Sequence, residues 1–203
     1  MTNPSLYADL PNLIIGFHGC DEETFEKVIY KGEDLKPSAN PYDWLGNGIY
    51  FWEQSLGRAW RWANDSIKFL KQTKGTIKNP AVIGAVINLG YCLNLLDNNC
   101  IDLLKNQYEL FSIGMEIANV EMPVNKGYQR NLDCAVIESL HNQRKSNGKV
   151  PFDSVRGVFI EGKEIYPSSG FMSNSHIQIC VRNPNCIKGY FAPREVNGEY
   201  NIV

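Results

Sequence analysis

The sequence predicts an α+β fold. Segments with the composition of strands alternate irregularly with segments whose apolar residues recur at helical spacing. Two strand-like runs, 177–181 and 187–191, follow one another near the C-terminus around an Asn-Pro-Asn turn. This mixed order, with a strand pair at the end, favours α+β over a doubly wound parallel sheet.

The first half of the chain begins with a predicted central strand at 13–19, an apolar run whose last side chain is polar. Asp21 predicts the N-cap of a helix, and Gly32 predicts its end. A loop rich in Pro, Ser, Asn and Asp follows at 36–45. The next helix, 56–71, is amphipathic and rich in tryptophan.

The second half contains the clearest predicted strand, 81–89, which is almost continuously β-branched and lies between a proline and a glycine. Apolar spacing predicts two further helices, and the remaining short apolar runs predict strands. We expect helices at 97–119 and 132–145, a loop at 121–130, and strands at 92–96 and 155–160.

Bulk composition is typical of one globular domain spanning 1–203, with a polar lead-in at 1–11 and a tail at 192–203. Apolar residues make up 43% and charged residues 21% of the chain, and the net charge is −2, which gives no strong attraction to nucleic acid or membrane. The N-terminus lacks the pattern of a signal peptide, and the apolar runs are too short to span a membrane. Six cysteines without CxxC spacing predict reduced thiols, a cytoplasmic location and no metal site.

The chain is organised around residues 46–51, Gly-Asn-Gly-Ile-Tyr-Phe. Two glycines end a polar loop, and a buried strand carrying Tyr50 and Phe51 follows at once. Such a turn places an aromatic side chain at a strand opening, where it forms the wall of a flat pocket. The structural alternative is a glycine-rich turn into an ordinary core strand.

Three polar or aromatic groups on predicted strands complete the pattern: the pair His18 and Gly19, Tyr50, and Gln178. Each has a structural explanation when taken alone, as a hydrogen-bonded histidine, a core tyrosine or a solvent-facing glutamine. Together they resemble the His-Tyr-Glu signature of the diphtheria-toxin-like and PARP-like ADP-ribosyltransferases. The resemblance spans 14–191, is most specific at 45–51, and is weakest at about 71–130.

The resemblance implies a fold of two small packed antiparallel sheets, with a cleft for NAD+ between them and helices at their flanks. It implies an enzyme that breaks the bond between nicotinamide and ribose through a transition state like an oxocarbenium ion. His18 would contact the adenosine ribose, the Gly19 backbone the nicotinamide carboxamide, and Tyr50 the nicotinamide ring. Phe51 would also contact NAD+, and Trp60 or Trp62 would close the other side of the nicotinamide.

Position 178 departs from the family pattern, because it carries Gln where the signature has Glu. An amide hydrogen-bonds a ribose hydroxyl, but it supplies neither a negative charge nor a general base. Three explanations remain open. In the first, transfer of a single ADP-ribose proceeds by positioning alone. In the second, another carboxylate such as Glu161 or Glu164 takes the role of the missing Glu. In the third, the domain binds NAD+ without chemistry.

The loop at 166–174 precedes the strand of Gln178, and in this family that loop contacts the acceptor. Its aromatic and polar side chains, among them Tyr166, Phe171 and Asn174, suit a protein or a nucleic acid equally. The sequence therefore predicts a mono-ADP-ribosyltransferase with NAD+ as substrate and an acceptor of undetermined class. A bacterial toxin or defence effector with an inhibitory protein partner fits this description.

Two other functions on the same fold stay open: a non-catalytic NAD+ or ADP-ribose sensor, and an NAD+-dependent RNA 2′-phosphotransferase. The phosphotransferase normally uses a basic cluster, which the sequence does not display. A cysteine hydrolase built from Cys20 and His18 is disfavoured, because a nucleophile and base so close in sequence have an unusual geometry. The 46–48 loop leads into a strand rather than a helix, which argues against a phosphate-binding loop.

Overall fold

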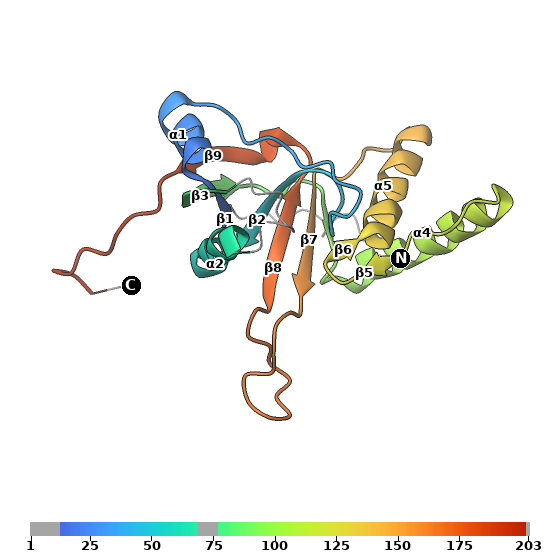
Figure 1. Cartoon of the computed structure of the whole chain (residues 1–203). Helices are drawn as coiled ribbons and strands as arrows, with labels where there is room; N and C mark the ends of the chain where they lie inside the picture. The colour runs from blue at the N-terminus through green and yellow to red at the C-terminus, as the bar shows by residue number, and fades with distance from the viewer. Residues whose placement is uncertain (1–12, 69–76, 202–203) are drawn as a thin grey trace.

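The structure, a computed structural model, describes residues 13–68 and 77–201 of the chain. Helices and strands follow one another in the mixed order expected of an α+β protein (Figure 1). The elements are β1 (Ile14–Asp21), α1 (Glu22–Lys31), β2 (Ile49–Glu53), α2 (Leu56–Lys68), β3 (Pro80–Ile87), β4 (Cys92–Asn94), α4 (Asn98–Ile117), β5 (Asn125–Lys126), β6 (Gln129–Arg130), α5 (Asn131–Ser146), β7 (Ser154–Phe159), β8 (His176–Val181), the short 3₁₀ helix η2 (Pro184–Cys186) and β9 (Ile187–Phe191).

Seven strands form one mixed sheet in the order β4-β7-β8-β2-β1-β3-β9, and β5 and β6 form a separate two-stranded hairpin. Only the β4–β7 pair is parallel. The expectation of two small packed antiparallel sheets is therefore wrong for the described residues. The strands join because β1 pairs on both sides, with β3 along its whole length and with β2 at one end.

Local capping fixes α1 where the sequence predicts it. The side chain of Asp21 accepts a hydrogen bond from Glu23 N (3.1 Å), and Gly32 ends the helix with φ 71°. The other carboxylate oxygen of Asp21 accepts from Asn79 N (2.9 Å) and Lys78 N (2.7 Å), and these bonds lower the pKa of Asp21. The same side chain thus caps α1 and joins the end of β1 to the segment that leads into β3.

The sheet has an apolar cluster on each face. On one face, side chains of β1, β2, β3 and β8 pack with α1 and with the start of β9. On the other face, α5 packs over β7 and β8, and α2 packs over β1 and β3. In Figure 1 the helices α4 and α5 stand at the β4 end of the sheet, and α1 stands at the β9 end. Among the described residues, no helix is long and apolar enough to cross a membrane.

Some boundaries differ from the sequence expectations. β1 continues to Asp21 instead of ending at Gly19, because it pairs with β3 over all eight residues. α4 passes through Gly114 without a break. The expected loop at 121–130 contains the β5–β6 hairpin, whose two-residue strands are too short to leave a periodic signal. The end of the helix expected at 56–71 lies outside the described residues.

Candidate functional site

The three strands that carry the signature residues lie side by side in the sheet. β2, with Tyr50, pairs with β1, which carries His18, on one side and with β8, which carries Gln178, on the other. More than 120 residues separate Tyr50 from Gln178 in the sequence, yet their strands are directly hydrogen-bonded (Figure 1). The fold thus brings the three predicted positions to the centre of one sheet.

The backbone pairing between β1 and β2 ends next to this centre. Their pairing covers only Gly16 with Glu53 and Phe17 with Trp52. Immediately beyond, Nδ1 of His18 lies 2.8 Å from the carbonyl oxygen of Tyr50. The imidazole therefore bridges the two strands where their backbone ladder has ended.

The bond to Tyr50 defines the protonation of His18. A carbonyl oxygen only accepts, so Nδ1 carries the proton and donates it. Burial lowers the pKa of His18, against the opposite effect of this hydrogen bond, and the ring is neutral at physiological pH. Nε2 is consequently a hydrogen-bond acceptor, and no described residue donates to it.

Tyr50 closes the turn that precedes it. Its hydroxyl donates to Gly46 O (2.7 Å) and accepts from Leu45 N (2.9 Å), and its half-buried ring packs against the cluster beneath α5. Burial raises the pKa of Tyr50, so the hydroxyl remains a donor. Tyr50 thus holds the turn in place.

A salt bridge that the sequence did not suggest holds the same turn from outside. Glu138 on α5 accepts a hydrogen bond from Asn47 N (2.8 Å), and Arg182, just after β8, donates to Asn47 O (2.9 Å). Glu138 and Arg182 also pair with each other. No local pattern marks these residues, because they meet the turn only after three distant segments have folded together.

Gln178 lies between Trp52 on β2 and Gly157 on β7. It is half-buried, and its carboxamide makes no hydrogen bond to the described residues. Its neighbour two positions earlier, His176, points to the same face by strand alternation. The amide therefore remains free to contact a ligand.

The predicted residues do not all share one face of the sheet. Pairing and alternation put Gln178, Trp52 and Gly19 on the face covered by α2, and His18 and Phe51 on the opposite face. The predicted site residues are therefore divided between the two faces of the sheet. Phe51 is 0% exposed within the core, so it supports this region from inside and does not line it, contrary to the expectation that it contacts NAD+.

Of the two candidate tryptophans, Trp62 is the one next to Gly19 and the β2 strand. A Cβ on Gly19 would lie 3.1 Å from Cε3 of Trp62, and the rings of Trp62 and Trp52 are 5.5 Å apart. Trp60 is 49% exposed and has no ring contact with another described aromatic residue. Trp62 therefore adjoins the signature strands, and which tryptophan stacks on nicotinamide stays a prediction.

The two candidate carboxylates differ in their surroundings. Oε2 of Glu161 lies 2.9 Å from Arg58 on α2 and 3.7 Å from Nδ1 of His176. Glu164 accepts from Ser168 N in the exposed connection between β7 and β8. Glu161 is thus the carboxylate closer to the sheet, but its charge is already shared with Arg58.

Two buried N–H donors in this region have no partner among the described residues. They are Trp52 Nε1 and Arg58 Nε, and the Arg58 guanidinium carbon lies 5.8 Å from the centre of the Trp52 ring. A buried donor without an acceptor is unfavourable, and in native proteins it often marks a place where a water or ligand oxygen binds. Both donors lie at the seam between α2 and the sheet face that carries Gln178.

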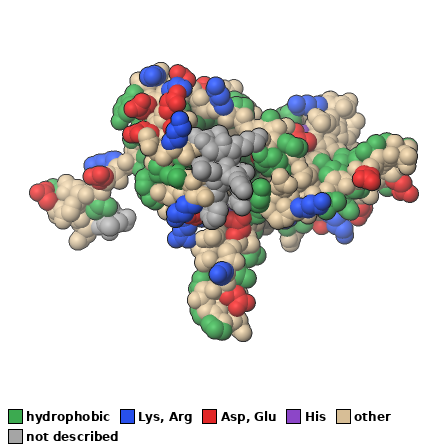
Figure 2. All heavy atoms as spheres, viewed as in Figure 1, with side chains coloured by type: hydrophobic (Ala, Val, Ile, Leu, Met, Phe, Trp, Pro, Cys, Tyr) green, Lys and Arg blue, Asp and Glu red, His purple; other side chains and the backbone are tan. Residues whose placement is uncertain are grey.

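The predicted acceptor loop is part of a projecting connection between β7 and β8 (Figure 1). Backbone bonds such as Ser173 N to Lys163 O (2.9 Å) make it a narrow ribbon. Tyr166 and Phe171 are 55% and 67% exposed, and Figure 2 shows apolar side chains near its tip. Asn174 lies at its base, where its side chain accepts a hydrogen bond from Arg61 on α2.

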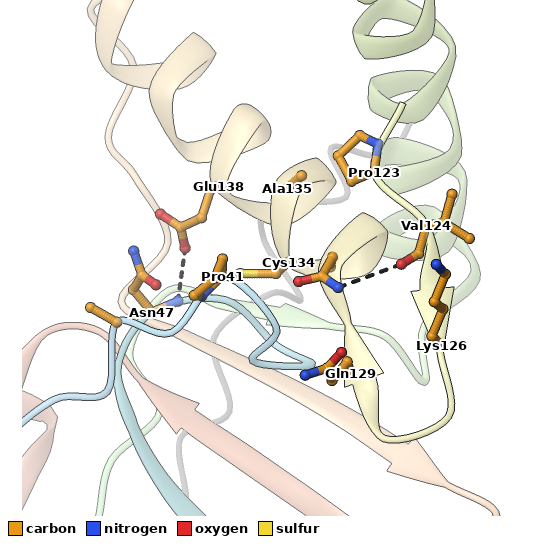
Figure 3. Close-up of a pocket in the computed structure, with 11 residues that line it drawn as sticks. Pro41, Asn47, Pro123, Val124, Lys126, Gln129, Cys134, Ala135 and Glu138 are labelled. Atoms are coloured by element: carbon orange, nitrogen blue, oxygen red, sulfur yellow. Dashed lines mark hydrogen bonds between the residues drawn. The ribbon is translucent and has the colours of Figure 1, made fainter. Parts of the chain in front are cut away.

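A hollow of about 730 Å³ lies outside the signature strands, between the loop before β2, the β5–β6 hairpin and α5 (Figure 3). No predicted site residue lines it. Asn47 and Glu138 stand at one end, and Gln129 and Lys126 stand at the other. Its lining comprises Ala39, Pro41, Asn47, Pro123, Val124, Lys126, Gln129, Asn131, Cys134, Ala135 and Glu138.

Comparisons with known proteins name no function. No protein-family model and no solved structure matches the chain. The chain is similar to the uncharacterized protein MJ0359 of Methanocaldococcus jannaschii, with 27% identity over 194 aligned residues that cover 85% of this chain and 83% of the relative. Among the described residues, no group of three or more His, Cys, Asp or Glu side chains is arranged to hold a metal ion.

Proposed function

We propose that the protein is an NAD+-dependent mono-ADP-ribosyltransferase. The observation that carries this proposal is the adjacency of β1, β2 and β8, with the His18 ring bridging to Tyr50 at the point where β1 and β2 separate. Three positions chosen from distant parts of the sequence lie on neighbouring strands. A chance match to the signature would not require that arrangement.

The protonation of His18 suits the role that the resemblance assigns to it. The neutral ring keeps Nδ1–H on the Tyr50 carbonyl and leaves the Nε2 lone pair free for a sugar hydroxyl. On the other face, the unpaired N–H groups of Trp52 and Arg58 suit ribose or phosphate oxygens of a dinucleotide. The residues present therefore fit NAD+ as a substrate.

In the proposed reaction, the bond between the nicotinamide nitrogen and ribose C1′ breaks and its electron pair leaves with nicotinamide. An acceptor atom then attacks C1′ and loses its proton. Gln178 holds the nicotinamide ribose by hydrogen bonding and adds no charge to the developing cation. Because an amide is no general base, we propose transfer of a single ADP-ribose and no chain elongation.

The amide of Gln178 also favours a second candidate function, an NAD+-binding module without catalysis. Glu161, the nearer of the two candidate carboxylates, is paired with Arg58, so its charge is partly neutralised. In that case NAD+ would bind at the same strands and remain intact. The two candidates differ in a single observable, the release of nicotinamide.

The experiment that tests the transferase is incubation of purified protein with adenine-labelled NAD+ and a cell lysate. Free nicotinamide and label in the protein, RNA and DNA fractions are followed together. The proposal predicts nicotinamide release with label in one macromolecular fraction, which identifies the acceptor class. Saturable binding of NAD+ without release would instead support the binding module.

A further inference from the structure

The hollow beside α5 has the size and lining of a small-molecule site. Its volume of about 730 Å³ lies within the range of about 300–1,000 Å³ typical of ligand pockets. Two segments far apart in the sequence, 39–47 and 123–138, build its walls, so it exists only in the folded protein. The 45–48 turn separates it from the signature strands, and nothing in the proposed transferase reaction uses it.

Three polar side chains of the hollow are free to bind a ligand. The carboxamides of Asn47 and Gln129 and the ammonium of Lys126 make no hydrogen bond or ion pair with another described residue. A carboxamide offers a donor and an acceptor side by side, which is the pattern that pairs with the edge of a nucleobase. The apolar wall includes Pro41 and Ala135, which offer a surface for the face of a ring.

The charge of the hollow suits an anionic ligand. Glu138 is its only carboxylate, and that group is paired with Arg182 and with Asn47 N. Lys126, at the opposite end, is exposed and unpaired among the described residues. A ligand that places a planar ring at the Asn47 end and a negative group at the Lys126 end therefore meets complementary groups at both ends.

We infer that the hollow binds a single nucleotide, with its base against the apolar wall and the carboxamides and its phosphate at Lys126. The inference does not depend on the transferase proposal, because the two sites share no residue. A metal ion is a poor alternative, since one carboxylate already paired with arginine is too few ligands. A purely apolar ligand would leave the carboxamides of Asn47 and Gln129 and the ammonium of Lys126 without partners.

Isothermal titration of the full-length protein with AMP, GMP, CMP and UMP tests the inference. Inorganic phosphate and the corresponding nucleosides are titrated separately, as is a short oligonucleotide with a 5′-phosphate. We expect saturable binding of at least one mononucleotide and much weaker binding of phosphate or nucleoside alone. Equal binding of the oligonucleotide would identify a nucleic-acid end as the natural source, and weaker binding would identify a free nucleotide.

Two variants test whether the nucleotide binds in the hollow. Ala135→Trp fills the hollow from α5, and Lys126→Glu reverses the charge at its rim; each is expected to weaken nucleotide binding about tenfold or more. Lys145→Glu, an exposed charge reversal on the same helix outside the hollow, is expected to leave it unchanged. Circular dichroism melting checks that each variant is folded. If Ala135→Trp does not fold, Lys126→Glu alone provides the test.

The inference is overturned if no mononucleotide binds at millimolar concentration. It is also overturned if binding persists unchanged in a folded Ala135→Trp or in Lys126→Glu, because the nucleotide would then occupy another site. Phosphate that binds as tightly as the nucleotide would likewise contradict recognition of the base. Nicotinamide release from NAD+, measured in the same Lys126→Glu protein, is expected to be unaffected, which separates this site from the proposed active site.

Discussion

Nδ1 of His18 donates a hydrogen bond to the carbonyl oxygen of Tyr50 over 2.8 Å, where β1 and β2 stop pairing. The bond joins the two most specific parts of the signature, which lie 32 residues apart in the sequence. It fixes the tautomer of the histidine and makes Nε2 an acceptor. The pair therefore defines both the geometry and the chemistry of the proposed site.

Replacing Tyr50 by Ala removes the aromatic wall proposed for nicotinamide. We expect NAD+ to bind more weakly by about 1–3 kcal/mol, the scale of aromatic stacking on a base. Tyr50→Phe keeps the ring and loses the hydroxyl with its bonds to Leu45 N and Gly46 O. It is expected to lower the free energy of unfolding by about 1–3 kcal/mol while retaining most of the NAD+ affinity. Unchanged affinity in a folded Tyr50→Ala protein would remove Tyr50 from the site.

Gln178→Glu restores the carboxylate of the family signature. We expect nicotinamide release to rise by about tenfold or more, because a negative charge then lies near the developing cation. Asn142→Asp, the same chemical change at an exposed position on α5, is the control and should have no effect. A fall in release by a folded Gln178→Glu protein would mean that the site is built around the amide.

Gly19 allows α2 to approach the sheet. A Cβ at this position would lie 2.6 Å from the carbonyl oxygen of Ala59, a backbone atom that cannot move unless the helix moves. Gly19→Ala is therefore expected to cost about 1–3 kcal/mol in urea unfolding. Gly189→Ala on β9, where a Cβ meets open space, is the matched control and should cost little. Equal stability of the two variants would contradict the close packing of α2 on β1.

His141 makes the stability depend on pH. It is 1% exposed, and burial lowers its pKa to about 4, with the nearby Arg182 adding to the effect. The unfolded chain, with a histidine pKa of about 6.5, binds the proton more readily, so stability is lost as pH falls from 6.5 towards 4. His18 and His176 act in the same direction, because burial lowers their pKa values too.

Urea unfolding at pH 7.5 and pH 5.0 measures this dependence. His141 alone is expected to lower the free energy of unfolding by about 2 kcal/mol at pH 5.0 relative to pH 7.5. His141→Gln, which lacks a titrating group, should show a difference smaller by that amount. An unchanged difference in the variant would show that the buried imidazole does not control the pH dependence.

The sequence predicted features that depend on local chemistry. Asp21 and Gly32 delimit α1 because capping involves only neighbouring residues, and 187–191 is the last strand of the sheet as expected. The single sheet was not predicted, since pairing of β1 with both β2 and β3 is decided between distant segments. The contact of Trp62 with Gly19 likewise depends on the rotation of α2 on the sheet.

The candidate site stays a prediction, and the sequence indicated only part of its surroundings. His18, Tyr50 and Gln178 carry recognisable motifs, and their strands are neighbours. The Glu138–Arg182 pair that holds the turn before Tyr50 left no signal, because its residues are 44 positions apart and meet only in the folded protein. His176 had a usable signal, since it lies two residues before Gln178 on the same strand and therefore faces the same way.

Titration of the purified protein with NAD+, alongside His18→Ala, tests the central claim most directly. If the three strands form an NAD+ site, the wild-type protein binds NAD+ saturably with one site per chain. The folded His18→Ala protein, which has lost Nε2 and the link to Tyr50, binds about tenfold more weakly. Failure of the wild-type protein to bind at millimolar NAD+, or equal binding by both proteins, would contradict the claim.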